Sequence, residues 1–171
     1  SSQLKPCKVG ASLIPNLIDE LPILFIASLF ATGDSEFFGV EELRHKESDR
    51  LLAMQSGLKN IEIETIYNSG KLTIEGKGSD YLIDSGTVDS FEDHRIAMAF
   101  IIAGLRSKKN LVIENTDCIK TSFPEFSYLL DSLGAKINEI QYLKKKNIHS
   151  KLEILLNKSK KGFNLKKINF T

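Results

Sequence analysis

Charged side chains gather at three points of the sequence, and each point comes just before an apolar run. The three stretches are "LIDELP" (17–22), "RHKESDR" (44–50) and "EDHR" (92–95). From Glu41 to Arg50 alone there are three Lys or Arg and four acidic residues. Such mixtures can bind anions and transfer protons near neutral pH. The chemistry that these residue types allow is therefore that of a site for an anionic small molecule.

The cations at these points stand where a helix does not favour them. A helix N-terminus carries a partial positive charge and unpaired N–H groups, so acids are favourable there and cations are not. Lys46, Arg50, His94 and Arg95 therefore call for a nearby anion. Arg95 is the sharpest case, because the helix predicted behind it is almost entirely apolar. Its guanidinium should pair with a carboxylate or a phosphate.

Two interpretations of these charges stay open on local chemistry alone. In the structural one, the residues from Lys46 to Arg50 are surface charge, and Arg95 belongs to an internal salt bridge. Ordinary helix caps then account for the acids Asp19, Glu20, Glu47, Asp49 and Asp93. In the functional one, Lys46, Arg50 and Arg95 line an anion site, and nearby carboxylates transfer protons.

Apolar patterning and end signals predict the elements that must hold these groups. The predicted helices are 17–32, about 48–56 with Gly57 ending it, 94–105 capped by Asp93, and one that starts at a Ser122/Glu125 capping box and ends at Gly134. The predicted strands are 36–40, 61–67, 71–76, 79–84, 110–115 and 135–140. In the second of these helices Leu51, Leu52 and Met54 are expected to point inward.

The order helix, strand, helix, strand occurs twice, with a period of about 74 residues. Lys46 and Ser48 open the second helix of one copy, and Lys120 and Ser122 open that of the other. The period is too long for a solenoid and suits a duplicated α/β unit with its helices inside and its sheets outside. At 171 residues the chain suits one domain, or part of a larger one.

Residues 138–171 depart from this pattern. They hold nine Lys and two acidic residues, which leaves the rest of the chain net acidic. Ile148, Leu152, Leu155 and Leu156 would suit a weak amphipathic helix. We interpret the segment as a solvated tail or an extension foreign to the domain, and the alternative is a basic arm for nucleic acid or membrane.

Composition argues against several function classes. The net charge is +1, which does not indicate nucleic acid or a membrane as partner of the whole chain. The longest apolar run, 21–31, is shorter than the ~20 residues that span a bilayer. The two Cys and three His show no metal-ligand spacing, so we expect no metal and a reducing, cytoplasmic location. Cys118 precedes a helix, where a thiol pKa can fall, but we expect a plain packing or loop residue.

Five stretches, in this order, resemble the enolpyruvyl transferase family. They are "SSQLK", "LIPNLIDELPIL", "EELRHKESDRL", "DHRIAMAF" and "CIKTSFPEF…LGAKI". The resemblance covers residues 1–137 and the C-terminal third of the family's chain, so a missing N-terminal part of the same enzyme is implied. It implies an inside-out α/β barrel of βαβαββ units around buried parallel helices. This chain would hold a partial domain of nearly two units.

The resemblance also implies an activity and roles for particular residues. The branch of the family with "KESDR" and "DHR" joins shikimate 3-phosphate to phosphoenolpyruvate and releases phosphate, without metal or organic cofactor. By resemblance, Asp19 contacts the shikimate hydroxyls and serves as base, Lys46 lies near the reacting hydroxyl, and Glu47 protonates the methylene carbon. Arg50 and Arg95 clamp phosphoenolpyruvate.

Some positions depart from the family's pattern. His45 stands where the family carries an aliphatic residue, and Thr121 stands where many members carry a Lys, so Lys120 is a displaced candidate for binding phosphoenolpyruvate. One alternative is the related transferase that acts on a UDP-sugar, which would carry other residues in place of "KESDR" and "DHR". Another is a truncated, non-catalytic chain. The isolated chain is expected to be inactive, because the family's cleft lies between two domains.

Overall fold

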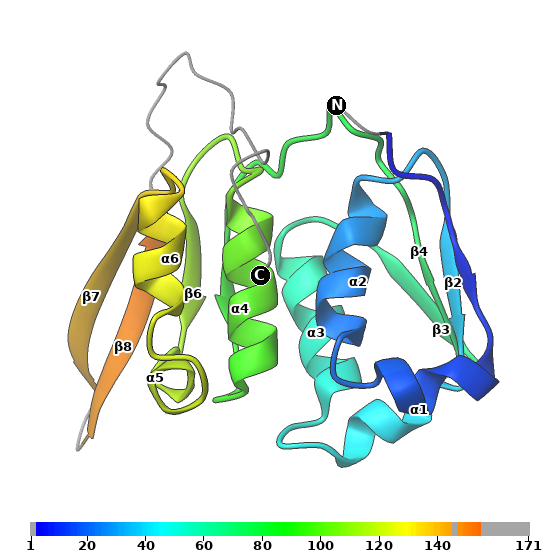
Figure 1. Ribbon diagram of the computed structural model, residues 1–171, viewed down its shortest axis with the longest axis horizontal. Helices are drawn as coiled ribbons and strands as arrows, with labels where there is room; N and C mark the ends of the chain where they lie inside the picture. The colour runs from blue at the N-terminus through cyan, green and yellow to red at the C-terminus, as the bar shows by residue number, and fades with distance from the viewer. Residues whose placement is uncertain (1–2, 145–146, 155–171) are drawn as a thin grey trace.

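Two four-stranded sheets form the outer layers of the protein, and helices lie between them (Figure 1). This computed structural model describes residues 3–144 and 147–154. The strand order is β1-β2-β4-β3 in the first sheet and β5-β6-β8-β7 in the second. In each sheet the first two strands are parallel and the other pairs are antiparallel. The chain is therefore a duplicated α/β unit with outward sheets, as its pattern predicts.

Both units follow the order βαβαββ. The first consists of β1 (Lys8–Val9), the short η1 (Ala11–Leu13) and α1 (Ile14–Leu17), α2 (Leu21–Leu29), β2 (Ser35–Phe38), η2 (Val40–His45), α3 (Arg50–Asn60), β3 (Thr65–Asn68) and β4 (Lys71–Ile74). The second consists of β5 (Gly86–Asp89), α4 (His94–Gly104), β6 (Leu111–Glu114), α5 (Cys118–Ser122), α6 (Phe126–Ser132), β7 (Ile137–Lys144) and β8 (Asn147–Ile154).

The core lies where α2, α3 and α4 pack against one another. α2 is apolar nearly all round, and Leu21, Phe25 and Leu29 are fully buried on it, so the helix belongs inside rather than at the surface. The three helices run in the same direction, with their N-termini at one end of the molecule (Figure 1). The charged stretches of the sequence are thereby brought to that end.

The helix predicted at 17–32 is shorter and corresponds to α2, and the predicted range contains only the last residue of α1. α1 ends at Leu17 and α2 begins at Leu21, with Asp19 and Glu20 in the turn between them. Pro22 explains the restart, because proline is tolerated in a first helical turn but not in a helix interior. Among the described residues no single helix is long and apolar enough to cross a membrane; Ala11–Leu17 and Leu21–Leu29 reach that length only as a pair bent by 112°.

Two predictions about α3 are wrong. Gly57 does not end the helix but lies inside it. The position needs a glycine because Phe100 of α4 packs where a side chain would stand. Leu52 does not point inward and is 55% exposed, whereas Leu51 and Met54 are buried as expected. The buried face of α3 therefore includes Leu51 and Met54 but not Leu52.

Three predicted local features also differ. The segment 79–84, all of it described, forms no strand and makes only an isolated bridge from Ile83 to Ser107. The predicted capping box does not form. Ser122 is the last residue of α5, and Glu125 precedes α6 without a side-chain cap within the described structure. Pro124 separates the two helices, since it disfavours a continuous helical ladder.

The helix predicted through Ile148 and Leu152 is a strand. Residues 147–154 form β8, which pairs with both β6 and β7 and gives β6 a partner on its open edge. β7 and β8 thus form an antiparallel pair in the second sheet that corresponds to the pair of β3 and β4 in the first sheet. Leu155 and Leu156 lie outside the described residues. The domain boundary predicted at 137 stays a prediction, and the described backbone runs across it within β7.

Candidate active site

The guanidinium of Arg50, the first residue of α3, is the centre of the charged cluster. It is fully buried, and a buried cation must be paired and hydrogen-bonded. Nε donates to Oδ2 of Asp93 at 2.7 Å and Nη1 to Oδ1 of Asp19 at 2.7 Å. Nη2 donates to Oε2 of Glu47. Carboxylates that precede three different helices thus meet on one arginine.

Arg95, in the first turn of α4, adds a second cation to this cluster. Its Nη1 donates to the carbonyl oxygen of Asp19 at 2.8 Å and lies 3.5 Å from Oε1 of Glu20. Its Nη2 lies 3.4 Å from Oδ2 of Asp19. Asp19 therefore bridges the two arginines and holds them side by side.

The cluster has a closed floor and an open rim. Arg50 and Asp93 are fully buried, whereas the side chains of Arg95, Asp19 and Glu47 are 32%, 42% and 57% exposed. A ligand from solvent would therefore meet Arg95, Asp19 and Glu47 first. It reaches the Arg50 guanidinium only by displacing the carboxylates that cover it.

The arginines also fix the charge of Asp19. The hydrogen bond from Arg50 is the main cause that lowers the pKa of Asp19, against the opposing effect of partial burial, and the charges of Arg95 and Lys46 lower it further. Asp19 is therefore ionised at neutral pH. Burial disfavours the charged form of Arg50, but hydrogen bonds to Asp93 and Asp19 raise its pKa above the ordinary value. The unliganded site is thus a set of fixed ion pairs.

Four of the residues singled out in the sequence come together. Asp19, Glu47, Arg50 and Arg95 share direct contacts, and the exposed Lys46 is near enough for its charge to act on Asp19. Arg95 forms the internal ion pairs of the structural interpretation and stays partly open to solvent, and its role in an anion site stays a prediction.

Lys120 is held elsewhere. Its ammonium group bonds Glu139 at 2.6 Å and Asp117 at 3.2 Å, and the hydrogen bond to Glu139 is the main cause that raises its pKa. These partners lie on the side of α5 and β7, not in the arginine cluster. Burial raises the pKa of the nearby Cys118 thiol, which fits a packing role rather than a reactive one.

Sequence reasoning identified Asp93 as a helix cap and missed its second role. Asp93 does cap α4, because Oδ1 accepts from the backbone N–H of Arg95 at 2.9 Å. Its other oxygen binds Arg50 and accepts from Ser48 Oγ at 3.1 Å. A signal was present in the repeat, since Asp19 and Asp93 occupy matching places about 74 residues apart.

An apolar groove of about 260 Å³ begins beside the cluster and runs between α2 and α4. Its polar end is formed by Asp19, Glu20 and Arg95. The apolar part is lined by Pro22, Ile23, Met98, Ala99, Ile102, Phe123 and Phe126. Ile23 and Phe123 are 37% and 39% exposed, so this groove leaves large apolar side chains open to water.

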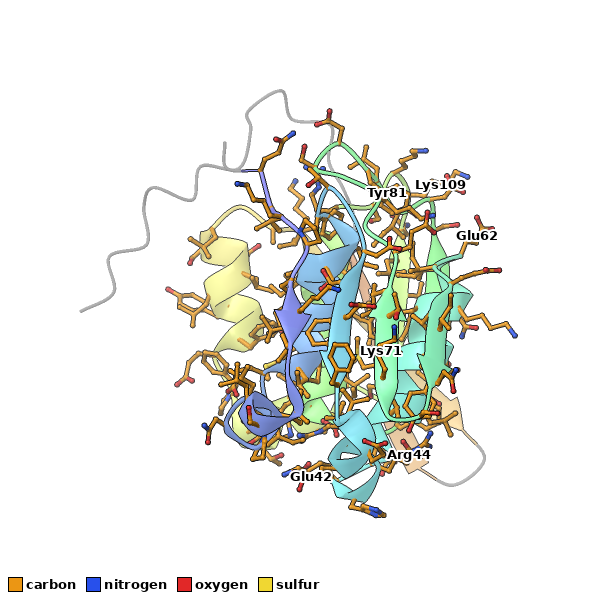
Figure 2. All side chains as sticks on the ribbon, turned by 90° about the vertical axis from the view of Figure 1, so that its right-hand side faces the viewer. Glu42, Arg44, Glu62, Lys71, Tyr81 and Lys109 are labelled. Atoms are coloured by element: carbon orange, nitrogen blue, oxygen red, sulfur yellow. The ribbon has the colours of Figure 1, made fainter. Side chains whose placement is uncertain are left out.

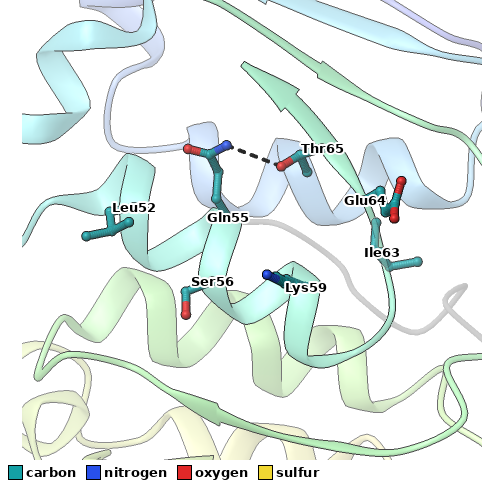
Figure 3. Close-up of a pocket in the computed structure, with 7 residues that line it drawn as sticks. All are labelled: Leu52, Gln55, Ser56, Lys59, Ile63, Glu64 and Thr65. Atoms are coloured by element: carbon teal, nitrogen blue, oxygen red, sulfur yellow. Dashed lines mark hydrogen bonds between the residues drawn. The ribbon is translucent and has the colours of Figure 1, made fainter. Parts of the chain in front are cut away.

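A second cavity lies away from the cluster of Asp19, Glu47, Arg50 and Arg95. A cavity of about 500 Å³ between α3 and β3 is bordered by a hydrogen bond from Gln55 Nε2 to Thr65 Oγ1 at 3.4 Å (Figure 3). It contains none of the site residues. Figure 2 shows Glu42 and Arg44 on η2 and Lys71 on the first sheet among the charged side chains of another face.

Comparison with known proteins adds the family. The family model for EPSP synthase (3-phosphoshikimate 1-carboxyvinyltransferase) matches residues 1–130, which is most of the chain. The chain belongs to the EPSP synthase family. The 3-phosphoshikimate 1-carboxyvinyltransferase of Magnetococcus marinus is 41% identical over 141 residues, which cover 82% of this chain and 32% of the relative. That of a Chelativorans species is 44% identical over 139 residues, which cover 81% and 31%.

Solved structures agree with this membership. A 2.37 Å structure of EPSP synthase from Acinetobacter baumannii has a TM-score of 0.73 and 39% sequence identity, and the match covers 77% of this chain and 31% of that one. The chain thus spans about a third of the length of the EPSP synthases it matches.

Proposed function

We propose that this chain forms the C-terminal part of an EPSP synthase. The whole enzyme would transfer the enolpyruvyl group of phosphoenolpyruvate to the 5-hydroxyl of shikimate 3-phosphate and release phosphate. The observation that carries the proposal is the pair of arginines joined by Asp19 under an open rim, in a chain of this family. Both substrates are phosphorylated carboxylates, and such a pair of cations is what gathering them requires.

The reaction sets the tasks that the site must perform. The 5-hydroxyl oxygen bonds to C2 of phosphoenolpyruvate and loses its proton, while C3 gains a proton. The tetrahedral intermediate then loses phosphate and a proton from C3, which restores the double bond. The protein must therefore hold two anions in contact and supply one base and one acid.

We assign the anion-binding task to Arg95 and Arg50. Arg95 is the more open of the two, so it would meet the phosphoenolpyruvate first. An anion that reaches Arg50 must compete with Asp19 and Glu47 for Nη1 and Nη2. The reaction site would therefore open as its ligand binds, and the two carboxylates would turn toward the substrates.

The carboxylates and Lys46 take the remaining tasks. Asp19 would contact the shikimate hydroxyls and act as base, and displacement from Arg50 would remove the main cause that lowers its pKa. Glu47, the most exposed acid of the cluster, would protonate C3. Lys46 would lie near the reacting hydroxyl. Lys120 would need to leave Glu139 and Asp117 before it could reach phosphoenolpyruvate.

We further propose that the groove between α2 and α4 receives the missing N-terminal part of the enzyme. Its exposed Ile23 and Phe123 would be costly to leave in water, and they border the active-site residues directly. Within residues 3–144 and 147–154, the two βαβαββ units with inward helices leave this side of the helical layer uncovered, so a further unit would extend the arrangement toward an inside-out barrel.

A chimera tests the proposed function. The matching C-terminal third of the Magnetococcus marinus relative is replaced by the corresponding residues of this chain, and phosphate release is measured with both substrates. We expect turnover that needs shikimate 3-phosphate and phosphoenolpyruvate together, with the unaltered relative as reference. A folded chimera without turnover would contradict the proposal and favour a non-catalytic remnant.

A further inference from the structure

Asp93 is a buried acid for which the proposed reaction has no use as acid or base. Its side chain is fully buried, and both oxygens are engaged. Oδ1 accepts from the backbone N–H of Arg95 at 2.9 Å. Oδ2 accepts from Nε of Arg50 at 2.7 Å and from Oγ of Ser48 at 3.1 Å. One carboxylate therefore touches both residues to which we assign anion binding.

The backbone before Asp93 is held in an uncommon conformation. Phe91 and Glu92 have φ values of 54° and 59°, in the left-handed region that non-glycine residues rarely adopt. Oδ1 of Asp89 fixes this turn, because it accepts from the backbone N–H of Phe91 at 2.8 Å and from Nδ2 of Asn115 at 2.7 Å. The surrounding hydrogen bonds thus set where the Asp93 carboxylate stands.

We propose that Asp93 is a positioning residue that orients both anion-binding arginines. This inference rests on the proposed function. The bond between Asp93 and Nε fixes the plane of the Arg50 guanidinium and directs Nη1 and Nη2 toward Asp19 and Glu47 at the rim. Its bond to the Arg95 amide fixes the start of α4, from which the second guanidinium extends.

Asp93 also gives Arg50 a permanent counter-ion. Asp19 and Glu47 are 42% and 57% exposed and can turn away when an anion arrives, whereas Asp93 is enclosed. A buried guanidinium that keeps one carboxylate partner does not become an unpaired charge during that exchange. Asp19 and Glu47 are therefore released for chemistry without loss of the arginine's position.

The test uses the 171-residue chain with inorganic phosphate as probe. Asp93→Asn keeps a good helix cap but removes the charge. Asp49→Asn is the matched control, because Asp49 caps α3 through the Leu52 amide at 2.9 Å and pairs with Arg44 at 3.0 Å on the surface. Nitrogen-15 NMR of the arginine side chains follows hydrogen exchange at Arg50 Nε and the response to phosphate.

We expect Asp93→Asn to speed exchange at Arg50 Nε about tenfold and to weaken phosphate binding by about the same factor, with Asp49→Asn like the wild type. Unchanged exchange in Asp93→Asn would overturn the proposal. Equal effects of both variants would also overturn it, because they would mean that losing the charge of any capping carboxylate, not the bond to Arg50, is responsible. If Asp93→Asn does not fold, Ser48→Ala replaces it, since it removes one bond from Oδ2. That variant should shift both readouts in the same direction, and no shift would overturn the inference.

The two proposals fail in different ways. If the wild-type chain does not bind phosphate at all, the anion site assigned under the proposed function fails for this chain. The exchange rate at Arg50 Nε still decides whether Asp93 positions that arginine, because it needs no ligand.

Discussion

Arg50 and Arg95 pose different problems for mutagenesis, although they belong to one network. Arg50 is fully buried, so its replacement would leave Asp93 as an uncompensated buried charge, and breaking such a pair costs about 3–5 kcal/mol. A loss of activity there would not separate binding from folding. Arg95 is 32% exposed and its acidic partners are also open to water. It is therefore the cleaner probe of anion binding.

In the chimera, we expect Arg95→Ala to raise the KM for phosphoenolpyruvate by about 10–100-fold and to change kcat less, because an anion clamp acts mainly in binding. Steady-state kinetics at saturating shikimate 3-phosphate measure this. Arg106→Ala is the control, since that arginine bonds the carbonyl oxygens of Ser79 and Tyr81, well away from the cluster. An unchanged KM in the Arg95 variant would remove the role we assign.

At the scale of elements, the packing of α3 against α4 depends on a glycine. A Cβ at Gly57 would lie 2.4 Å from Cζ of Phe100 and 3.0 Å from Cγ1 of Val88. The position is in a helix interior, where alanine would otherwise be preferred by roughly 1 kcal/mol. The contact shows that tertiary packing, not helix propensity, chooses this residue.

Gly57→Ala should therefore destabilise the chain by about 1–3 kcal/mol, the usual cost of overpacking, despite the gain in helix propensity. Urea unfolding followed by circular dichroism measures the free energy of unfolding. Gly10→Ala is the control, because a Cβ there meets nothing within 4 Å and the backbone is extended. If the Gly57 variant proved as stable as the wild type, α3 and α4 would not be packed as described.

The elements also show which features a single sequence can predict. The β3–β4 hairpin and the Asp93 cap follow from neighbours within a few positions, and both form as expected. The role of Gly57 depends on Phe100, and that of β8 on its pairing with β6, which lies far away in the chain. Local pattern does not contain such partners, so it misassigned both segments.

In the candidate site, too, some features follow from the local sequence and others depend on partners far away in the chain. Resemblance and helix position brought Asp19, Glu47, Arg50 and Arg95 to notice, and the structure joins them directly. The bond between Asp93 and Arg50 spans the two units, so no local pattern could reveal it.

At the scale of the whole molecule, an ion-pair cluster crosses the outer face of the first sheet. Glu36 on β2 bonds Lys8 on β1 and Lys71 on β4, each at 2.8 Å. The hydrogen bond from Lys71, followed by that from Lys8, lowers the pKa of Glu36 to about 2. Three strands of the sheet are thus tied by one carboxylate.

This cluster should make stability depend on pH. Because the pKa of Glu36 is lower in the folded chain than its ordinary value of 4.5, its contribution is fully present above that pH and is lost as the pH falls toward about 2. Glu36→Gln should therefore lower the free energy of unfolding at pH 6 and make it depend less on pH between pH 5 and about 2. Urea midpoints across this range measure it. Glu75→Gln, at an exposed pair with Lys77, is the control and should leave the slope unchanged.

Under the proposed function, the chain would supply only one side of the cleft. It spans about a third of its relatives and brings Asp19, Lys46, Glu47, Arg50 and Arg95 to one end of its helices. Positioning of reactants accounts for about 7–11 kcal/mol of such a barrier, so half of a site should lose nearly all of the rate. The residues that this chain supplies should nevertheless be essential once the cleft is complete.

Phosphate release by the isolated chain and by the chimera, each with and without Glu47→Gln, tests this central claim most directly. We expect no measurable turnover from the isolated chain, turnover from the chimera, and a loss of about 10²–10⁴-fold in kcat when Glu47 is replaced in the chimera. Glu42→Gln, which alters another exposed acid of the same stretch, should keep the activity. Turnover by the isolated chain that Glu47→Gln abolishes, or a chimera indifferent to Glu47, would contradict the account.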